Sequence, residues 1–365
     1  MTMTRSARIT AAIGALLLST LLAACGGPTD PSAGDSPVPD PSGSPTSTAG
    51  GEGDGGGESE HPLATDATCA DLVPADSLRS LFSTPVAPVG PERTSAYIAT
   101  NLDAWWVAES AGGLACEWQD ATSLVTSEGM YDYRGVRVLL APAAHAGFSE
   151  YSHQFASPGD DVSDCSVDMC TRDVYLNGWW LSLFGMGFEN AEYLDHAMRQ
   201  YDAIVERVRA LPAPTAIAHT SSLTGDCVEL LPADRIGHAF DVPASAVQVD
   251  QENRNTFRDN VLASLGGMTC YLSVNGTELG IVETLPSGAW AQRDAVAAYL
   301  ELGGTEQQID IPGVDEPGSL REQVDASGFD VAFDGDWIKL IIWPSASYPT
   351  ENIAYAVANA IVGVG

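Results

Sequence analysis

CADLVPAD, residues 69–76, returns later in the chain as CVELLPAD, residues 227–234. The two stretches share a cysteine, a leucine and the tripeptide Pro-Ala-Asp at matching positions. Internal similarity of this kind is the sequence signature of a repeated structural unit. The fold of the chain therefore depends on how far the likeness extends beyond this phrase.

Further pairs of stretches match in the same order, namely AGGLACEW (111–118) with LGGMTCYL (265–272), and VYLNGWWLSLF (174–184) with VAFDGDWIKLI (331–341). A segment with helical periodicity ends each set, which makes four matched landmarks. We therefore predict a duplicated domain, with one copy over residues 67–212, a connector at 213–224 and a second copy over 225–365.

Turn signals predict how each copy begins and where its hairpins lie. Asn177-Gly178, Asn275-Gly276 and Asp334-Gly335 are two-residue hairpin turns between runs of strand-forming residues. Pro74 and Pro232 suit the first position of a helix, so a short helix is expected at each.

Other segments have the pattern of helices. Residues 143–155 and 289–302 are helix-like. The last helix of each copy has an apolar face, made by Leu194, Met198, Tyr201, Val205 and Val208 and by Ile353, Val357, Ala360 and Val364. We predict an α+β fold of two tandem copies, each an antiparallel sheet of two hairpins with helices packed over one face.

The cysteines fit the duplication. Six of the seven remain after Cys25 is set aside, and even numbers of cysteines outside the cytoplasm usually pair. Cys69 and Cys116 match Cys227 and Cys270, so each pair is expected to close within its own copy. Cys165 and Cys170 have no counterpart and are expected to pair with each other, as a structural bridge in preference to a redox motif, because CSVDMC lacks the C-x-x-C spacing.

The N-terminus predicts export and a lipid anchor. Arg5 and Arg8 precede the uncharged apolar run 11–22, which is too short for a comfortable membrane span. Leu22-Ala23-Ala24-Cys25 resembles a bacterial lipoprotein lipobox, in which the cysteine starts the mature chain and carries lipid on its thiol. We predict a signal peptide over residues 1–24 and lipid attachment at Cys25; an ordinary secretory signal is the alternative.

Composition describes the rest of the mature chain. Residues 25–66 are rich in Gly, Pro and Ser and acidic, so we predict a disordered linker that reaches about 35 Å. The chain has a net charge of −33, which becomes −35 once a leader with two arginines and no acid is removed. This charge opposes binding to nucleic acid and permits attraction of basic partners, although solubility alone is a sufficient explanation.

Three features together resemble a known group of proteins: a cysteine before a Leu-Pro-like helix, a later Gly-Gly-x-x-Cys strand and an Asn/Asp-Gly hairpin. They resemble actinobacterial cell-surface lipoproteins of unsettled function, whose disulfide-paired α+β domain is similar to the extracytoplasmic sensor domains of mycobacterial receptor kinases. The resemblance implies a lipid-anchored protein on the outer face of the membrane of a Gram-positive envelope. It supplies no catalytic residue, and this chain differs in carrying two copies and no kinase domain.

The sequence contains no recognisable catalytic or metal-binding motif. There is no G-x-S-x-G elbow, no S-x-x-K with its companion motifs and no H-E-x-x-H. Asp160-Asp161 and Asp334-Gly335-Asp336 do not continue into a calcium-loop pattern. We expect no catalytic residue, metal or cofactor.

Large aromatic side chains give the one positive indication of a site. We take Trp105, Trp106, Trp179, Tyr131 and Tyr133 as candidates for a ligand or partner surface. Neighbouring residues of a strand point to opposite faces, so only one of Trp179 and Trp180 can face the core. Matching with Trp337 makes Trp180 the core residue and leaves Trp179 for the surface; packing under a loop or against the other copy is the alternative.

These observations favour a non-enzymatic binding or sensing module that is anchored to the membrane by its lipid. Its partner is expected to be a small molecule or an envelope protein. A site between the two copies is one place for such a ligand. The alternatives are an accessory subunit of an envelope complex and, with the least support, an envelope hydrolase.

Overall fold

The computed structural model describes residues 63–78, 81–90, 102–120, 122–126, 129–131, 133–166, 168–219, 221–223, 225–251, 256–322, 326–345 and 347–363. All of them belong to one compact unit, Gly57–Gly365. The predicted signal peptide, Cys25, the linker as far as residue 62 and Val364 lie outside the described residues.

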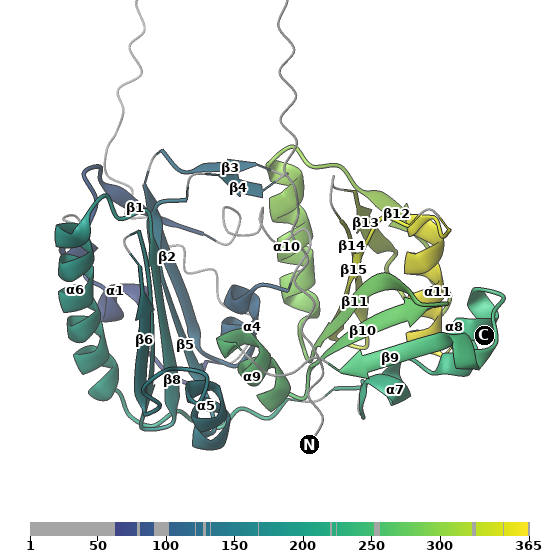
Figure 1. The fold of residues 1–365 in the computed structure, drawn as a ribbon, viewed down its shortest axis with the longest axis horizontal. Coiled ribbons are helices and arrows are strands. Elements are labelled where there is room, and N and C mark those ends of the chain that lie inside the picture. Colours follow the sequence, from purple (N-terminus) through teal and green to yellow (C-terminus); the bar gives the residue numbers. More distant parts are fainter. Residues whose placement is uncertain are drawn as a thin grey trace, which may run out of the picture. The chain divides into compact units, whose positions relative to one another are not determined.

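The first copy is built around one antiparallel sheet (Figure 1). Its elements are α1 (Cys69–Leu72), α2 (Ala75–Leu78), β1 (Val86–Val89), α4 (Ala104–Ser110), β2 (Leu114–Asp120), β3 (Leu124–Thr126), β4 (Gly129–Tyr131), β5 (Gly135–Pro142), α5 (His145–Ser152), β6 (Asp161–Cys165), β7 (Met169–Leu176), β8 (Trp179–Met186) and α6 (Ala191–Arg209). Six strands pair in the order β1-β2-β5-β8-β7-β6, while β3 and β4 pair separately.

The second copy repeats this arrangement. Its elements are α7 (Cys227–Leu230), α8 (Ala233–Ala239), the 3-10 helix η2 (Ala244–Ala246), β9 (Val247–Gln251), α9 (Phe257–Ser264), β10 (Met268–Val274), β11 (Thr277–Leu285), α10 (Ala289–Glu301), β12 (Gln307–Ile309), β13 (Gly318–Arg321), β14 (Ser327–Phe333), β15 (Asp336–Ile342) and α11 (Thr350–Val362). The strand order β9-β10-β11-β15-β14-β13 matches that of the first sheet, and β12 is added at the end. The predicted α+β class is confirmed.

The three predicted hairpin turns are present. Asn177, Asn275 and Asp334 all have positive φ angles, between 50° and 53°, and a glycine with positive φ follows each of them. Backbones of this kind match the right-handed twist of the two strands they join, which is why Asn-Gly and Asp-Gly are favoured there. The predicted helices at 143–155 and 289–302 are α5 and α10.

The repeated Gly-Gly pair has a geometric cause. Gly112 and Gly266 follow α4 and α9 with φ angles of 78° and 84°, a conformation that glycine adopts without a steric penalty. The next glycine crosses close to a neighbouring strand: a Cβ on Gly113 would lie 1.8 Å from the Leu140 carbonyl oxygen, and one on Gly267 2.5 Å from that of Thr284. The pair therefore turns a helix directly into a central strand.

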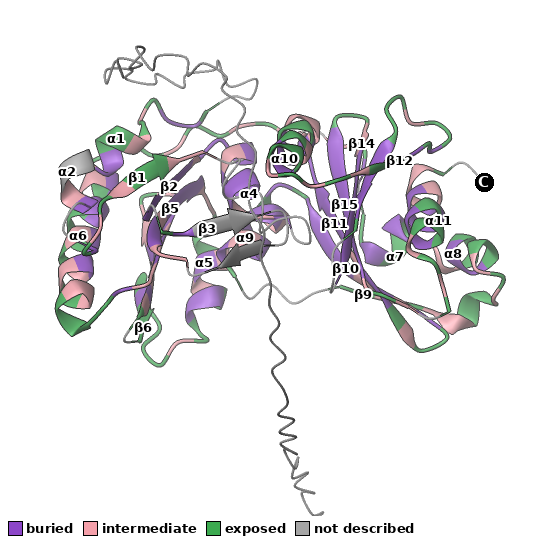
Figure 2. Ribbon diagram, turned by 90° about the horizontal axis from the view of Figure 1, so that it is seen from above, coloured by how far each residue is buried: buried purple, intermediate pink, exposed green. Residues whose placement is uncertain are grey.

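Helices cover both faces of each sheet, which corrects the expectation of one covered face. In the first copy, Leu181 packs with Tyr201 of α6 on one face, while Trp180 packs with Phe148 of α5 on the other. The cause is that central strands such as β5 have buried side chains on both faces of the sheet. Neither face can therefore remain in water. Buried residues accordingly run through β11, β14 and β15 of the second sheet (Figure 2).

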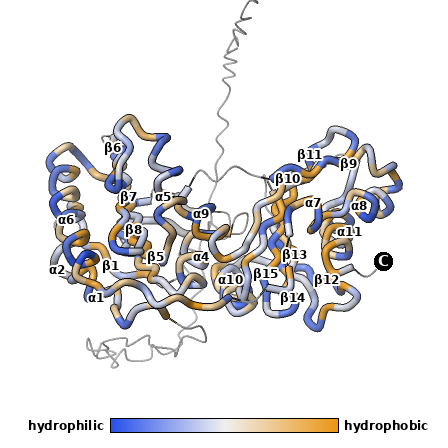
Figure 3. Tube along the Cα trace, turned by 90° about the horizontal axis from the view of Figure 1, so that it is seen from below, coloured by the Kyte–Doolittle hydropathy of each residue, from blue (hydrophilic) through white to orange (hydrophobic). Residues whose placement is uncertain are grey.

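Hydrophobic residues of the second copy concentrate in its central strands and in α11 (Figure 3). Ile353 and Val357 of α11 are buried in the same cluster as Leu340 and Ile342 of β15. The apolar face predicted for the last helix is therefore the face that covers the sheet. No helix among the described residues has both the length and the apolar character needed to cross a membrane.

The three predicted disulfides are confirmed. Cys69–Cys116 joins α1 to β2, and Cys227–Cys270 joins α7 to β10 at the equivalent place in the second copy. Cys165–Cys170 joins β6 to β7. The two long-range bridges close 47 and 43 residues of chain, whereas the third closes only 5.

Loop length predicts how much each bridge stabilises the fold. Replacing both Cys227 and Cys270 by alanine should lower the free energy of unfolding by about 4 kcal/mol, and replacing Cys165 and Cys170 by about 2 kcal/mol, because a longer loop restricts the unfolded chain more. Urea unfolding at neutral pH measures both values. A larger loss from the short bridge would contradict the prediction.

Candidate functional site

Side chains from both copies form one buried cluster where the copies meet. The first copy contributes residues of α4, α5 and β8, and the second contributes residues of α9, α10 and β15. Two ring contacts cross the boundary: Trp106 meets Trp290 edge-on with centroids 5.8 Å apart, and Trp180 meets Phe257 at 5.5 Å. The two copies are therefore packed together through aromatic side chains.

This packing corrects the predicted aromatic surface. Trp105, Trp106 and Trp179 expose only 5%, 1% and 0% of their surface. Trp105 and Trp106 lie in the cluster between the copies, and Trp180 and Trp337, which match in sequence, occupy it together. Trp179 faces the other side of its sheet, which is also covered, so no tryptophan of the set is left at the surface.

Tyr133 is not part of that cluster. Tyr133 is partly buried, with its ring 5.9 Å from that of Phe184. Burial raises the pKa of its hydroxyl, and the neighbouring Glu117 carboxylate raises it further. The side chain of Tyr131 lies outside the described part of the structure.

A buried row of charged side chains crosses the second sheet. Lys339, the only lysine in the chain, is fully buried with its Nζ 3.1 Å from an oxygen of Asp330. Asp330 also accepts hydrogen bonds from the indole of Trp337 at 2.8 Å and from Arg321. Burial lowers the pKa of Lys339 to about 8, and the Asp330 carboxylate opposes this shift. Although burial acts in the opposite direction, Arg321 and Lys339 hold the pKa of Asp330 below its ordinary value.

The row ends at the boundary with the first copy. Glu283 is paired in register with Lys339 and is 1% exposed. One of its oxygens lies 2.7 Å from Arg258 Nη1, and the other accepts the Leu102 amide of the first copy at 2.7 Å. Arg258 Nη1 also donates to the Leu102 carbonyl at 3.3 Å. Burial raises the pKa of Glu283, and Arg258 opposes the rise.

A cleft of about 400 Å³ opens beside this boundary. Both copies and the connector line it: Ala111, Pro142, Ala143, Ala144, Asn177, Gly178, Ala213, Pro214, Thr215, Ala216, Ile217, His219, Ser264 and Leu265. Although the chain has 49 acidic residues, no carboxylate or arginine occurs among the described residues of this lining, and His219 is its one ionisable side chain. Burial lowers the pKa of His219, which favours a neutral imidazole.

Equivalent positions in the two copies fix the two ends of the connector. Trp179 follows the Asn177-Gly178 turn, and its indole donates to the Pro212 carbonyl at 2.8 Å. Asp336 follows the matching Asp334-Gly335 turn and accepts hydrogen bonds from the Ser221 hydroxyl at 2.7 Å and the Ser222 amide at 3.1 Å. The connector is thereby held against both copies, and its middle part forms a wall of the cleft.

A second hollow of about 400 Å³ lies between α8 and α11 and belongs to the second copy alone. Arg235 lines it, and its Nη1 donates to the Ala360 carbonyl at 3.1 Å, near the end of α11. Cations at the C-terminal end of a helix stabilise it, so Arg235 already has a structural role. We therefore take the cleft between the copies as the candidate site.

The cleft offers several hydrogen-bonding side chains. Asn177, Thr215, Ser264 and His219 supply its polar side chains. Ser264 donates its hydroxyl to the Val261 carbonyl at 2.7 Å, as serines in helices commonly do. Among the described residues no group of three or more histidine, cysteine, aspartate or glutamate side chains is placed to hold a metal ion. The lining therefore combines apolar walls with a few hydrogen-bonding side chains.

Sequence reasoning missed α4 and α9, which bring the copies together. Their capping residues were the available signal. Asp103 accepts the Trp105 amide at 2.7 Å, and Thr256 accepts the Asp259 amide at 3.2 Å.

Comparison with known proteins found no matching family model, no similar curated protein and no similar solved structure.

A carboxyl group at the boundary predicts a pH effect. Burial raises the pKa of Glu109 from 4.5 to about 8, the Trp105 indole opposes this, and the Asp294 charge in α10 adds to it. Between these pH values the folded chain holds a proton that the unfolded chain has released, so this group makes stability fall as pH rises. The free energy of unfolding of Glu109→Gln, taken relative to that of the parent, should therefore rise by at least about 1 kcal/mol between pH 4.5 and pH 8.

Urea unfolding at the two pH values measures this gain. Glu301→Gln, on the exposed surface of α10, is the matched control and should leave the pH profile unchanged. Parallel profiles for Glu109→Gln and the parent would contradict the assignment.

The duplicated turns offer a second test, because the glycine of only one of them lies against the connector. Gly178 and Gly335 have φ angles of 91° and 88°, so alanine is strained equally at both. A Cβ on Gly178 would also lie 3.0 Å from Cδ of Pro214, whereas one on Gly335 would meet nothing within 4 Å. Gly178→Ala should cost about 1 kcal/mol more than Gly335→Ala in urea unfolding, and equal losses would show that Pro214 gives way freely.

Proposed function

We propose that the protein is a lipid-anchored extracytoplasmic module that binds or senses a small molecule in the cleft between its two copies. The lipobox-like Leu22-Ala23-Ala24-Cys25 supports the anchor, and three disulfides are typical of a protein made for an oxidising compartment. The resemblance to actinobacterial lipoproteins supports an outer-surface location in a Gram-positive envelope. Nothing in this proposal requires catalysis.

The observation that carries the proposal is the lining of the cleft. A volume of about 400 Å³ falls within the range of small-molecule sites, and three separate parts of the chain are held in place to form it. The lining is uncharged in a strongly acidic protein, with apolar walls and a few hydrogen-bonding side chains. Its ligand is therefore a small neutral molecule with both apolar and polar groups.

An accessory role in an envelope complex is the second candidate. Its support is limited to apolar side chains on the outer helices of the second copy, where Val228 of α7 is 60% exposed and Tyr355 of α11 is 43% exposed. Exposed single residues are common on protein surfaces, so they favour this candidate less than the cleft favours a ligand.

Filling the cleft tests the proposal. Ala216 is exposed on the connector and lines the cleft, so Ala216→Trp should occupy the ligand space without disturbing either core. The full-length protein, purified from its own host in mild detergent, is weighed by native mass spectrometry. We expect a small-molecule mass on the parent that Ala216→Trp reduces at least about tenfold.

Ala70→Trp, at an exposed position of α1, is the matched control and should retain the bound mass. A parent chain without a bound small molecule, or equal retention of the bound mass by both variants, would favour the accessory role instead.

A further inference from the structure

The disulfide Cys165–Cys170 is the one bridge that the duplication does not explain. The other two bridges occupy equivalent places in the two copies. In the second copy the position equivalent to Cys170 is Ser327, and β13 and β14 pair there without a bridge. The corresponding strand pair therefore forms without a disulfide in the second copy, where β12 pairs with β13 on its other side.

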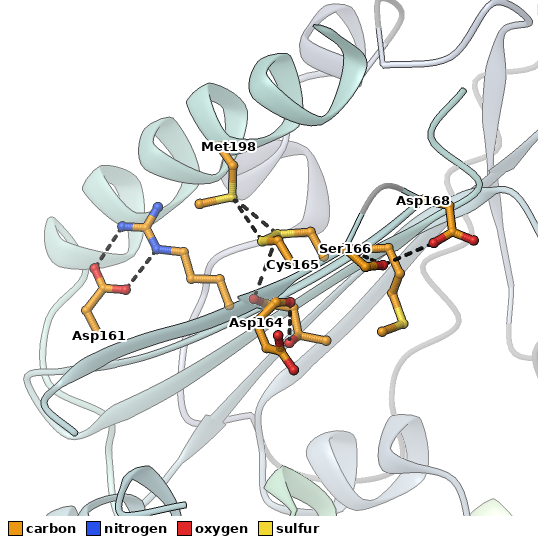
Figure 4. Close-up of a disulfide and its surroundings, with 10 residues drawn as sticks. Asp161, Asp164, Cys165, Ser166, Asp168 and Met198 are labelled. Carbon is orange, nitrogen blue, oxygen red and sulfur yellow. Dashed lines mark hydrogen bonds and ion pairs between the residues drawn. A yellow bond between two sulfur atoms is a disulfide. The ribbon is translucent and has the colours of Figure 1, made fainter. Parts of the chain in front are cut away.

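The two sulfur atoms differ in access (Figure 4). Cys165 is exposed on the edge strand β6, and Cys170 opposite it on β7 is fully buried. Met198 of α6 covers the bridge, with its sulfur 3.3 Å from that of Cys170 and 3.8 Å from that of Cys165. In the duplicated bridges, Cys116, Cys227 and Cys270 expose 2% or less of their surface, and Cys69 is partly buried. An external thiol therefore reaches one sulfur of this bridge more easily than the others.

We propose that Cys165–Cys170 is a thiol-exchange site, which an uncharged or cationic low-molecular-weight thiol attacks at Cys165. The thiolate forms a bond to Cys165 Sγ while the Cys165–Cys170 bond breaks, and Cys170 leaves as a thiolate that takes a proton from water. A second thiol then attacks the mixed disulfide at the external sulfur. This releases reduced Cys165 and the oxidised external disulfide, so two thiols are oxidised for one bridge reduced.

Carboxylates around the bridge select the thiol. Asp161 and Asp164 lie on β6, with the side chain of Asp164 on the opposite face of the sheet from Cys165, and Asp168 lies in the turn before β7 (Figure 4). Asp161 is paired with Arg172 at 2.8 Å, and Asp168 accepts the Ser166 hydroxyl at 3.0 Å. Negative charges close to an exposed sulfur repel a thiolate that carries further negative charge, and salt weakens that repulsion. Anionic thiols should therefore react slowly, and faster as ionic strength rises.

Reduction has a local structural consequence. Among the described strands, β6 lies at the edge of its sheet and pairs only with β7, and the bridge is the covalent tie between them. Without it, β6 is held by backbone hydrogen bonds and by Arg172, which binds Asp161 and Asp202. Exchange at this site thus loosens the outer edge of the first sheet and leaves both duplicated bridges intact.

The test is stepwise reduction of the folded full-length protein, followed by alkylation and peptide mass spectrometry. With dithiothreitol, Cys165 and Cys170 should be labelled at concentrations at least tenfold below those that label the other four body cysteines. Glutathione, which is anionic, should react at least several-fold more slowly than 2-mercaptoethanol, and added salt should reduce this difference in rate. Simultaneous labelling of all six cysteines would overturn the proposal.

Variants separate the two features of the site. Trapped mixed disulfides should form on Cys165 in the parent, and Met198→Ala should allow them on Cys170 as well. Asp164→Asn with Asp168→Asn should reduce the preference for uncharged thiols, whereas Asp310→Asn, exposed in the second copy, should not. Mixed disulfides mainly on Cys170 of the parent, or an unchanged preference in the double variant, would show that access and charge do not direct the exchange.

Discussion

The buried carboxylate of Glu283 is the constraint on which the arrangement of the two copies depends. Its burial would be costly without partners, and Arg258 and the Leu102 amide supply them from opposite sides of the boundary. Removing one member of such a group leaves the others buried and unpaired, which is far more damaging than losing a surface ion pair. The aromatic cluster gives the copies their area of contact, and this ion pair fixes which contact is made.

The two copies share a backbone plan and differ in their buried polar residues. Each sheet buries one aspartate that accepts a tryptophan indole, Asp173 from Trp180 at 3.0 Å and Asp330 from Trp337 at 2.8 Å. In the first copy the second donor is the neutral Tyr151 hydroxyl at 2.7 Å, and burial raises the pKa of Asp173. In the second copy the other donors are the cations Arg321 and Lys339. The duplication thus preserved one buried carboxylate and placed it in two different electrostatic environments.

The cleft is a product of the duplication and does not belong to either copy alone. Its walls come from the end of β5, the β7–β8 turn, the end of α9 and the connector. Trp179 and Asp336, at matched positions, hold the two ends of that connector, so a repeated structural feature was used to fasten a non-repeated segment. A binding site of this kind can vary in its connector and loop residues while both cores stay unchanged.

The amino-acid sequence by itself determined the features that depend on local patterns or on the repeat: the α+β class, the hairpin turns, the apolar faces of α6 and α11, and the pairing of all six body cysteines. Only the tertiary structure decided that Trp105, Trp106 and Trp179 are buried, that helices cover both faces of each sheet, and that Lys339 lies beside Asp330. The physical reason is that turn chemistry and periodicity act over a few residues. Burial of a side chain depends instead on what the other copy places against it.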